Sequence, residues 1–173
     1  MQFGGQFNFI TYFLLTIFIF KANVVAACKC EGEISTEDAV KYSEIVFKGV
    51  VLSRTITAAF DEYGIVAKGD SSVLKLLGTN PIAAYKIKVG SVFKGKQKFD
   101  TVVILTPVNS VGCGVSFKIG QEWIVYAGTK DDVLSSNSVQ RFTSKEGVYF
   151  TNLCTRTTQW YREEENAIRH YMR

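Results

Sequence analysis

Residues 45–52 read Ile-Val-Phe-Lys-Gly-Val-Val-Leu, and this stretch indicates the fold more strongly than any other in the 173-residue sequence. It is dominated by β-branched and aromatic residues, which favour strands. Gly49 interrupts it, and a glycine inside a strand is typical of a bulge or a sharp bend. The stretch therefore predicts a bent strand of the kind that closes β-barrels.

Four further strands are predicted on the C-terminal side of this stretch. In Tyr85–Val89 apolar residues alternate with lysine, as in a half-buried strand. The other three are Thr101–Thr106, Glu122–Ala127 and Val148–Leu153. The intervening residues 53–83 contain several Gly, Asp, Ser and Asn-Pro turn signals, so we expect a long loop or an irregular hairpin there.

Two helices are expected to flank these strands. Ser35-Thr36-Glu37-Asp38 is a capping signal for a short helix ending near Tyr42. Residues 160–172 carry acids early and bases late, which suits a helix dipole. Strands and helices do not alternate, so we predict an all-β fold with flanking helices, a five-stranded OB-like Greek-key β-barrel.

The N-terminus carries the features of an export signal. Phe9–Phe20 is an apolar run of 12 residues, shorter than the roughly 20 that cross a bilayer. Small residues follow at Val25-Ala26-Ala27, as signal peptidase requires. We predict a cleaved signal peptide over residues 1–27, a single domain over 28–173, and a secreted, extracellular protein. The alternative is a signal anchor that stays attached.

Charge and composition exclude several function classes. Beyond residue 27 the chain has 19 basic and 16 acidic residues, too mild an excess for a nucleic-acid binder. His170 is the single histidine, and no nucleophile–base pair is evident, so we expect no enzymatic activity and no cofactor of its own. We interpret the lysines between residues 86 and 98 as a solvated face rather than a glycan site.

The cysteines predict two disulfides. All four of them, Cys28, Cys30, Cys113 and Cys154, lie after the predicted cleavage site, and an even number in an exported chain indicates paired thiols. A bond between Cys28 and Cys30 would be strained, since one residue separates them. Each therefore pairs with a distant partner, and two pairings remain open.

Three segments follow one another in an order that is more specific than any one of them alone. The first is Cys28-Lys29-Cys30 directly after the cleavage site. The second is the succession Phe93-Lys94-Gly95, Thr106-Pro107 and Cys113-Gly114-Val115, and the third is Cys154 followed by Trp160. Together these segments resemble the N-terminal domain of the tissue inhibitors of metalloproteinases, over most of residues 28–160. The resemblance implies a netrin-like OB domain with disulfides Cys28–Cys113 and Cys30–Cys154.

The resemblance also implies a mechanism. In that family the N-terminal cysteine chelates the catalytic zinc of the target protease through its α-amine and carbonyl oxygen, a role that falls here to Cys28. The partner would be a zinc metalloprotease that supplies the zinc in trans, bound by a monomer. The protease-contact residues would be Lys29, Cys30 and Glu31, with a second ridge of Val108, Asn109, Ser110, Val111 and Gly112.

The sequence departs from the family around the first cysteines. Lys29 stands where the family has a small hydroxyl residue, and Glu31-Gly32 stand where it has a small polar residue and proline. An ammonium group is costly to bury in an apolar protease pocket. Lys29 therefore predicts either weak inhibition of ordinary matrix proteases or a target whose pocket is acidic.

Two alternatives remain open. One is an extracellular netrin-like binding module that inhibits nothing. The other follows from Val25-Ala26-Ala27-Cys28, which also resembles a bacterial lipobox. A lipidated Cys28 would anchor the protein to a membrane, on the periplasmic side in a bacterium, and would abolish zinc chelation. It would also leave three cysteines, an awkward number for an exported protein.

Overall fold

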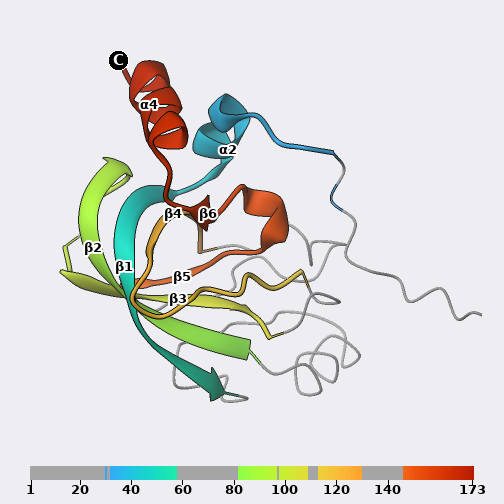
Figure 1. Cartoon of the computed structure of the whole chain (residues 1–173), viewed down its shortest axis with the longest axis vertical. Coiled ribbons are helices and arrows are strands. Elements are labelled where there is room, and N and C mark those ends of the chain that lie inside the picture. The colour runs from blue at the N-terminus through green and yellow to red at the C-terminus, as the bar shows by residue number, and fades with distance from the viewer. Residues whose placement is uncertain (1–29, 31, 58–81, 97, 109–112, 130–145) are drawn as a thin grey trace, which may run out of the picture.

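A computed structural model describes residues 30, 32–57, 82–96, 98–108, 113–129 and 146–173 (Figure 1). The elements follow in the order α2 (Thr36–Tyr42), β1 (Ile45–Thr57), β2 (Ile82–Lys94), β3 (Thr101–Pro107), β4 (Glu122–Ala127), β5 (Val148–Phe150), η2 (Leu153–Thr155), β6 (Thr158–Gln159) and α4 (Arg162–Tyr171). The predicted signal peptide, residues 1–27, lies outside the described residues.

The strands form one mixed sheet in the order β5-β3-β2-β1-β4-β6. All neighbours are antiparallel except β3 and β5, which are parallel. An isolated antiparallel bridge also joins Gly128, just after β4, to Phe150 of β5, with N–O distances of 3.1 and 2.7 Å. The sheet is open, but this bridge brings strands from its two halves together at one point.

The long hairpin of β1 and β2 bends, as the glycine in residues 45–52 predicted. The register shifts between Val46 and Phe47, between Lys48 and Gly49, and between Val51 and Ser53. At Gly49 an added Cβ would lie 2.6 Å from the carbonyl oxygen of Lys88. Glycine at this position therefore allows β2 to approach β1 closely at the bend.

The sheet separates two apolar clusters. The inner cluster includes Phe47, Ile87 and Val125. The outer cluster packs helices α2 and α4 against the other face of β1 and β4, and its members are Ala39, Val40, Val46, Ile124, Tyr126 and Ile168. Figure 1 shows the two helices together at one end of the sheet. Because β1 and β4 are covered on both faces, their sequences are apolar without strict alternation.

The all-β prediction with flanking helices agrees with this architecture, and the five predicted strands correspond to β1–β5. The loop prediction for residues 53–83 was wrong at both ends, since 53–57 belong to β1 and 82–83 to β2. These ends pair with each other, Ile56 with Ala83 and Thr57 with Ile82, and the threonines and isoleucines among them favour strands. The predicted strand Val148–Leu153 is shorter, because Leu153 begins η2. Strand β6, which has only two residues, was missed.

Among the described helices, none combines the length and the apolar character needed to span a bilayer.

Candidate functional site

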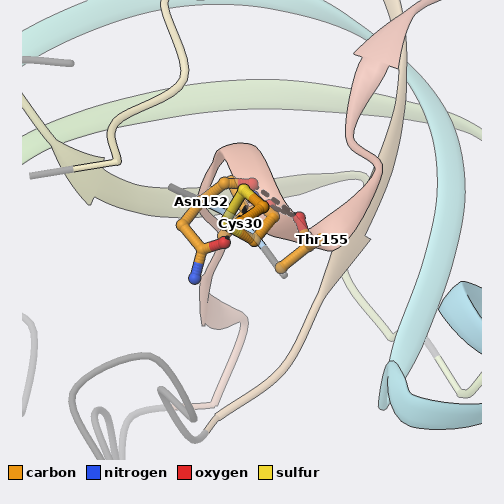
Figure 2. The surroundings of a disulfide bond; sticks show 5 residues. Cys30, Asn152 and Thr155 are labelled. Carbon is orange, nitrogen blue, oxygen red and sulfur yellow. Dashed lines mark hydrogen bonds between the residues drawn. A yellow bond between two sulfur atoms is a disulfide. The ribbon is translucent and has the colours of Figure 1, made fainter. Parts of the chain in front are cut away.

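The site is built around a disulfide between Cys30 and Cys154, residues 124 positions apart (Figure 2). Cys154 lies in the single turn η2, which Asn152 caps by accepting a hydrogen bond from the Cys154 amide at 2.8 Å. Thr155 closes the same turn by donating its hydroxyl to the Asn152 carbonyl at 2.8 Å. The disulfide therefore attaches the N-terminal part of the chain to a turn that local hydrogen bonds already hold.

Threonines on both sides of η2 hydrogen-bond it to the sheet. Thr151 donates its hydroxyl to the carbonyl of Tyr126 in β4 at 2.8 Å, and its Oγ1 lies 2.7 Å from Oγ1 of both Thr155 and Thr157. The Thr157 hydroxyl accepts from the Tyr126 amide at 3.0 Å. This chain of hydroxyls ties both sides of the turn to β4.

The N-terminal arm, which we define as Cys30 with residues 32–34, leads from the disulfide into helix α2. Gly32 has φ +95°, and its amide donates to the Cys30 carbonyl at 2.8 Å. At the other end of the arm, the Ile34 carbonyl accepts a hydrogen bond from Nη1 of Arg156 at 2.8 Å. Ser35 then caps α2 by accepting from the Asp38 amide. The described arm is thus held at both ends.

Cys113 reaches the same turn from the connection between β3 and β4. It is buried, its backbone is left-handed with φ 61°, and its carbonyl accepts from the Leu153 amide at 2.8 Å. Two residues later, the Val115 amide donates to the buried hydroxyl of Thr106. Two residues of η2 therefore contact these cysteines: Cys154 bonds to Cys30, and Leu153 donates to Cys113.

The structure describes only some of the predicted contact residues. Cys30 lies on the turn, and Val108 packs against the inner cluster. The bond between Cys30 and Cys154 is the one that the resemblance implied. Cys28, Lys29, Glu31 and Asn109–Gly112 lie outside the described residues, and so does one half of the predicted Cys28–Cys113 bond.

A buried carboxylate, Glu164 of α4, holds the arginine that clamps the arm. Arg156 donates to it twice, from Nε to Oε1 and from Nη2 to Oε2, both at 2.7 Å. Tyr126 donates at 2.5 Å and Tyr161 at 2.9 Å. Glu164 is 2% exposed, so this charge is removed from water and fully paired within the protein.

The protonation of this cluster follows from its geometry. Burial alone would raise the pKa of Glu164, but the hydrogen bonds from Arg156, Tyr126 and Tyr161 outweigh it and hold the pKa below its usual value. Burial and the Glu164 carboxylate raise the pKa of Tyr126. The bonds to Glu164 also raise the pKa of Arg156. The cluster is therefore an ion pair with two neutral phenols at neutral pH.

An open groove of about 470 Å³ lies beside the disulfide. The arm and residues of the 153–161 segment line it together: Cys30, Gly32, Glu33, Ile34, Leu153, Cys154, Arg156, Thr158 and Tyr161. Leu153 and Tyr161 are 48% and 41% exposed. The groove thus combines exposed apolar side chains with one cation and one carboxylate.

The other candidate groups are possible metal ligands, His170 and the lysines between residues 86 and 98; neither His170 nor these lysines line the groove. Within the described ranges no three His, Cys, Asp or Glu side chains come together as a metal site. His170 is exposed in the last turn of α4. Among the lysines, Lys94 donates to the carbonyls of Val40 and Lys41 at the end of α2, and Lys98 pairs with Glu146. Lys86, Lys88 and Lys96 are exposed, which agrees with a solvated face.

The cluster around Glu164 was not predicted from the sequence, although one signal was present. Trp160, Glu164 and Ile168 recur every four residues, the last two on one face of α4 and Trp160 just before the helix begins at Arg162. The first and last of them pack into the outer cluster, so the carboxylate between them must be buried too. A charge on an apolar stripe predicts a buried partner, and Arg156 is that partner.

The sequence matches no family model, and no curated protein matches it.

Proposed function

We propose that this chain is a secreted protein inhibitor of zinc metalloproteases, a monomer without catalytic activity of its own. Cys28 would occupy the open coordination position of the protease zinc with its α-amine and carbonyl oxygen. The amine chelates only when unprotonated, which its usual pKa of about 7.7–8.0 permits near neutral pH. The ordered succession of Cys28-Lys29-Cys30, Cys113-Gly114-Val115 and Cys154 is the sequence support for this proposal.

The observation that carries the proposal is the attachment of Cys30 to Cys154 on a turn that also binds Cys113. Cys30 is two residues from the proposed chelating group, and Cys113 ends the proposed ridge of Val108–Gly112. Anchoring both beside one turn is what a two-part protease contact requires. Rigidity there favours affinity, because a terminus that is already ordered loses less entropy on binding.

The proposal includes the finer fold, a netrin-like OB barrel of five strands. Two features support it: the parallel pairing of β3 with β5, and the bridge from Gly128 to Phe150. Together with the antiparallel pairs, they give the cyclic neighbour order β1-β2-β3-β5-β4. This order suits a partly open Greek-key barrel.

Lys29 would determine which proteases are inhibited. Its side chain would enter the pocket beside the zinc, where an unpaired ammonium group is costly. We therefore propose a target with an acidic pocket, and weak inhibition of enzymes whose pocket is apolar. Lys29→Ser, which restores a small hydroxyl side chain, should strengthen inhibition of the apolar-pocket enzymes.

The first test is the intact mass and N-terminal sequence of the natively secreted protein, unreduced and reduced. The proposal requires a chain that starts at Cys28 with a free amine and shows four thiols only after reduction. Lipid on Cys28, or residues before it, would rule out chelation and leave an anchored or soluble binding module.

The second test is inhibition of a panel of zinc metalloproteases by wild type, by Lys29→Ser, and by a matched control with one alanine added before Cys28. The added residue blocks the α-amine without changing the domain. Inhibition by the natural N-terminus that the extension abolishes supports the mechanism. Equal inhibition by both, or none by either wild type or Lys29→Ser, would contradict it.

A further inference from the structure

Arg156 links three parts of the chain that are distant in sequence. Its backbone is left-handed, with φ 69°, and it ends the turn that carries Cys154. Two of its nitrogens bind Glu164 of α4, and the third binds the Ile34 carbonyl, 122 residues earlier.

The three nitrogens of the Arg156 guanidinium donate to three different oxygens. The bidentate contact with Glu164 fixes the plane of the group, because the carboxylate is itself held by Tyr126 and Tyr161. With the plane fixed, Nη1 is aimed at the Ile34 carbonyl at 2.8 Å. The Glu164 cluster therefore acts as a rigid support, and Arg156 is the part that touches the arm.

We propose that Arg156 is a positioning residue that sets the path of the N-terminal arm and so the direction in which the chain leaves Cys30. The inference rests on the proposed function, since the proposed zinc-chelating group lies two residues before Cys30. The disulfide holds one end of the arm. At the other end Ile34 packs against the outer cluster and leads into α2, and Arg156 adds the hydrogen bond that fixes the direction of the Ile34 carbonyl. Without that hydrogen bond the arm would keep more freedom between its two attachments, and ordering it on binding would cost affinity.

The test uses Arg156→Lys with Tyr126→Phe as its matched control. A lysine keeps a positive charge beside Glu164, but its one nitrogen cannot reach three oxygens that the guanidinium reaches with three. Arg156→Lys therefore loses the clamp on Ile34. Tyr126→Phe removes one hydrogen bond to Glu164, but Tyr161 still holds the carboxylate and both Arg156–Glu164 bonds remain, so Arg156 and the arm should stay in place.

Two readouts are expected to separate the variants. Hydrogen exchange of the Gly32 amide, which bonds to the Cys30 carbonyl, should become roughly tenfold faster in Arg156→Lys and stay at the wild-type rate in Tyr126→Phe. Inhibition of a protease that wild type inhibits should weaken roughly tenfold in Arg156→Lys only. A thermal melt on both variants measures the purely structural cost.

Unchanged Gly32 exchange in Arg156→Lys would overturn the proposal, and so would a loss of inhibition no larger than in Tyr126→Phe. If wild type inhibits no protease, the proposed function fails while Gly32 exchange still decides whether the clamp exists. If Arg156→Lys does not fold, the double variant Arg156→Met/Glu164→Met replaces it, because this variant removes the clamp without leaving an unpaired charge. The same exchange readout then decides.

Discussion

At the scale of single residues, Glu165 of α4 connects its helix to strand β1 and to the segment that precedes the helix. It accepts from Lys48 of β1 at 3.1 Å, from the indole of Trp160 at 2.8 Å, and from Arg169 one turn later at 2.7 Å. Lys48 also lies over the Trp160 ring, 5.2 Å from its centroid. Through these contacts the partly exposed Glu165 carboxylate helps to hold α4 against the sheet.

We predict that Glu165 makes stability depend on acidic pH. Hydrogen bonds from Arg169, Trp160 and Lys48 lower the pKa of Glu165 from 4.5 to about 2. A carboxylate with a lowered folded-state pKa stabilises the protein above its unfolded pKa, and this stabilisation is lost as pH falls through the folded pKa. The free energy of unfolding of wild type should therefore fall from pH 4.5 to pH 2.

Urea titrations across that range check this, with Glu165→Gln and Glu163→Gln compared. Glu165→Gln should be less stable than wild type at pH 7 and show a shallower fall below pH 4.5. Glu163 is exposed and forms no ion pair with a described residue, so Glu163→Gln should follow wild type. Parallel curves for wild type and Glu165→Gln would contradict the assignment.

At the scale of elements, the bend in the hairpin of β1 and β2 depends on a missing side chain. An added Cβ at Gly49 would meet the Lys88 carbonyl at 2.6 Å and Cγ2 of Ile87 at 2.7 Å. Backbone oxygen cannot move aside without shifting β2. At Gly90, on the opposite strand, the nearest atom would be the Lys48 carbonyl at 3.4 Å, which is a tolerable contact.

Gly49→Ala should therefore destabilise the protein by about 2 kcal/mol, as overpacking does. Gly90→Ala is the matched control and should change stability by less than about 0.5 kcal/mol, since alanine also restricts the unfolded chain. Urea unfolding at pH 7 measures both. Similar losses in the two variants would show that the close approach of β2 at Gly49 does not account for the effect.

Helix α2 is held at its C-terminal end by a lysine from β2. The Lys94 ammonium donates to the carbonyls of Val40 and Lys41, at 2.7 and 2.9 Å, which the helix leaves without intrahelical partners. A cation there also complements the negative end of the helix dipole. Lys94 of the lysine-rich strand β2 therefore helps to hold α2 in place.

Lys94→Met should reduce the free energy of unfolding by about 1 kcal/mol, the usual scale for such hydrogen bonds. Lys96→Met, two positions later and exposed, is the control and should be neutral. Both values come from the midpoint of urea unfolding at constant m-value. A neutral Lys94→Met would mean that α2 is held by its apolar face alone.

At the scale of the whole molecule, contacts between the first and last described segments close the fold. The disulfide joins residues 124 apart, Arg156 binds Ile34, and α2 packs on α4. Figure 1 shows the C-terminus on the helical side, near α2. The architecture thus depends on contacts between distant parts of the chain.

Replacing both cysteines, Cys30→Ser with Cys154→Ser, should lower the free energy of unfolding by about 5 kcal/mol, the chain-entropy value for so long a loop. Using both serines avoids a free thiol that could exchange with other cysteines. Urea unfolding of the double variant against unreduced wild type measures the loss. A loss under about 1 kcal/mol would show that the other end-to-end contacts already order the N-terminal arm.

Local sequence patterns were sufficient to predict most of the individual strands and helices. The apolar run at 45–52 predicted a bent strand, the alternation at 85–89 a half-buried one, and the cap at Ser35 a helix that ends at Tyr42 as expected. These features depend on neighbours within a few residues, so the local pattern suffices to predict them. Of the candidate site, the sequence identified Cys30 and Cys154 as disulfide cysteines.

Features that depend on distant partners could be found only in the folded protein. The extension of β1 to Thr57 required β2 beside it, and β6 required the edge of β4. The Arg156–Glu164 pair lies only eight residues apart in sequence, but it matters because Tyr126 and Ile34 meet it from elsewhere. Burial of a charge is stable only when all its partners are assembled at once, and that condition belongs to the folded molecule.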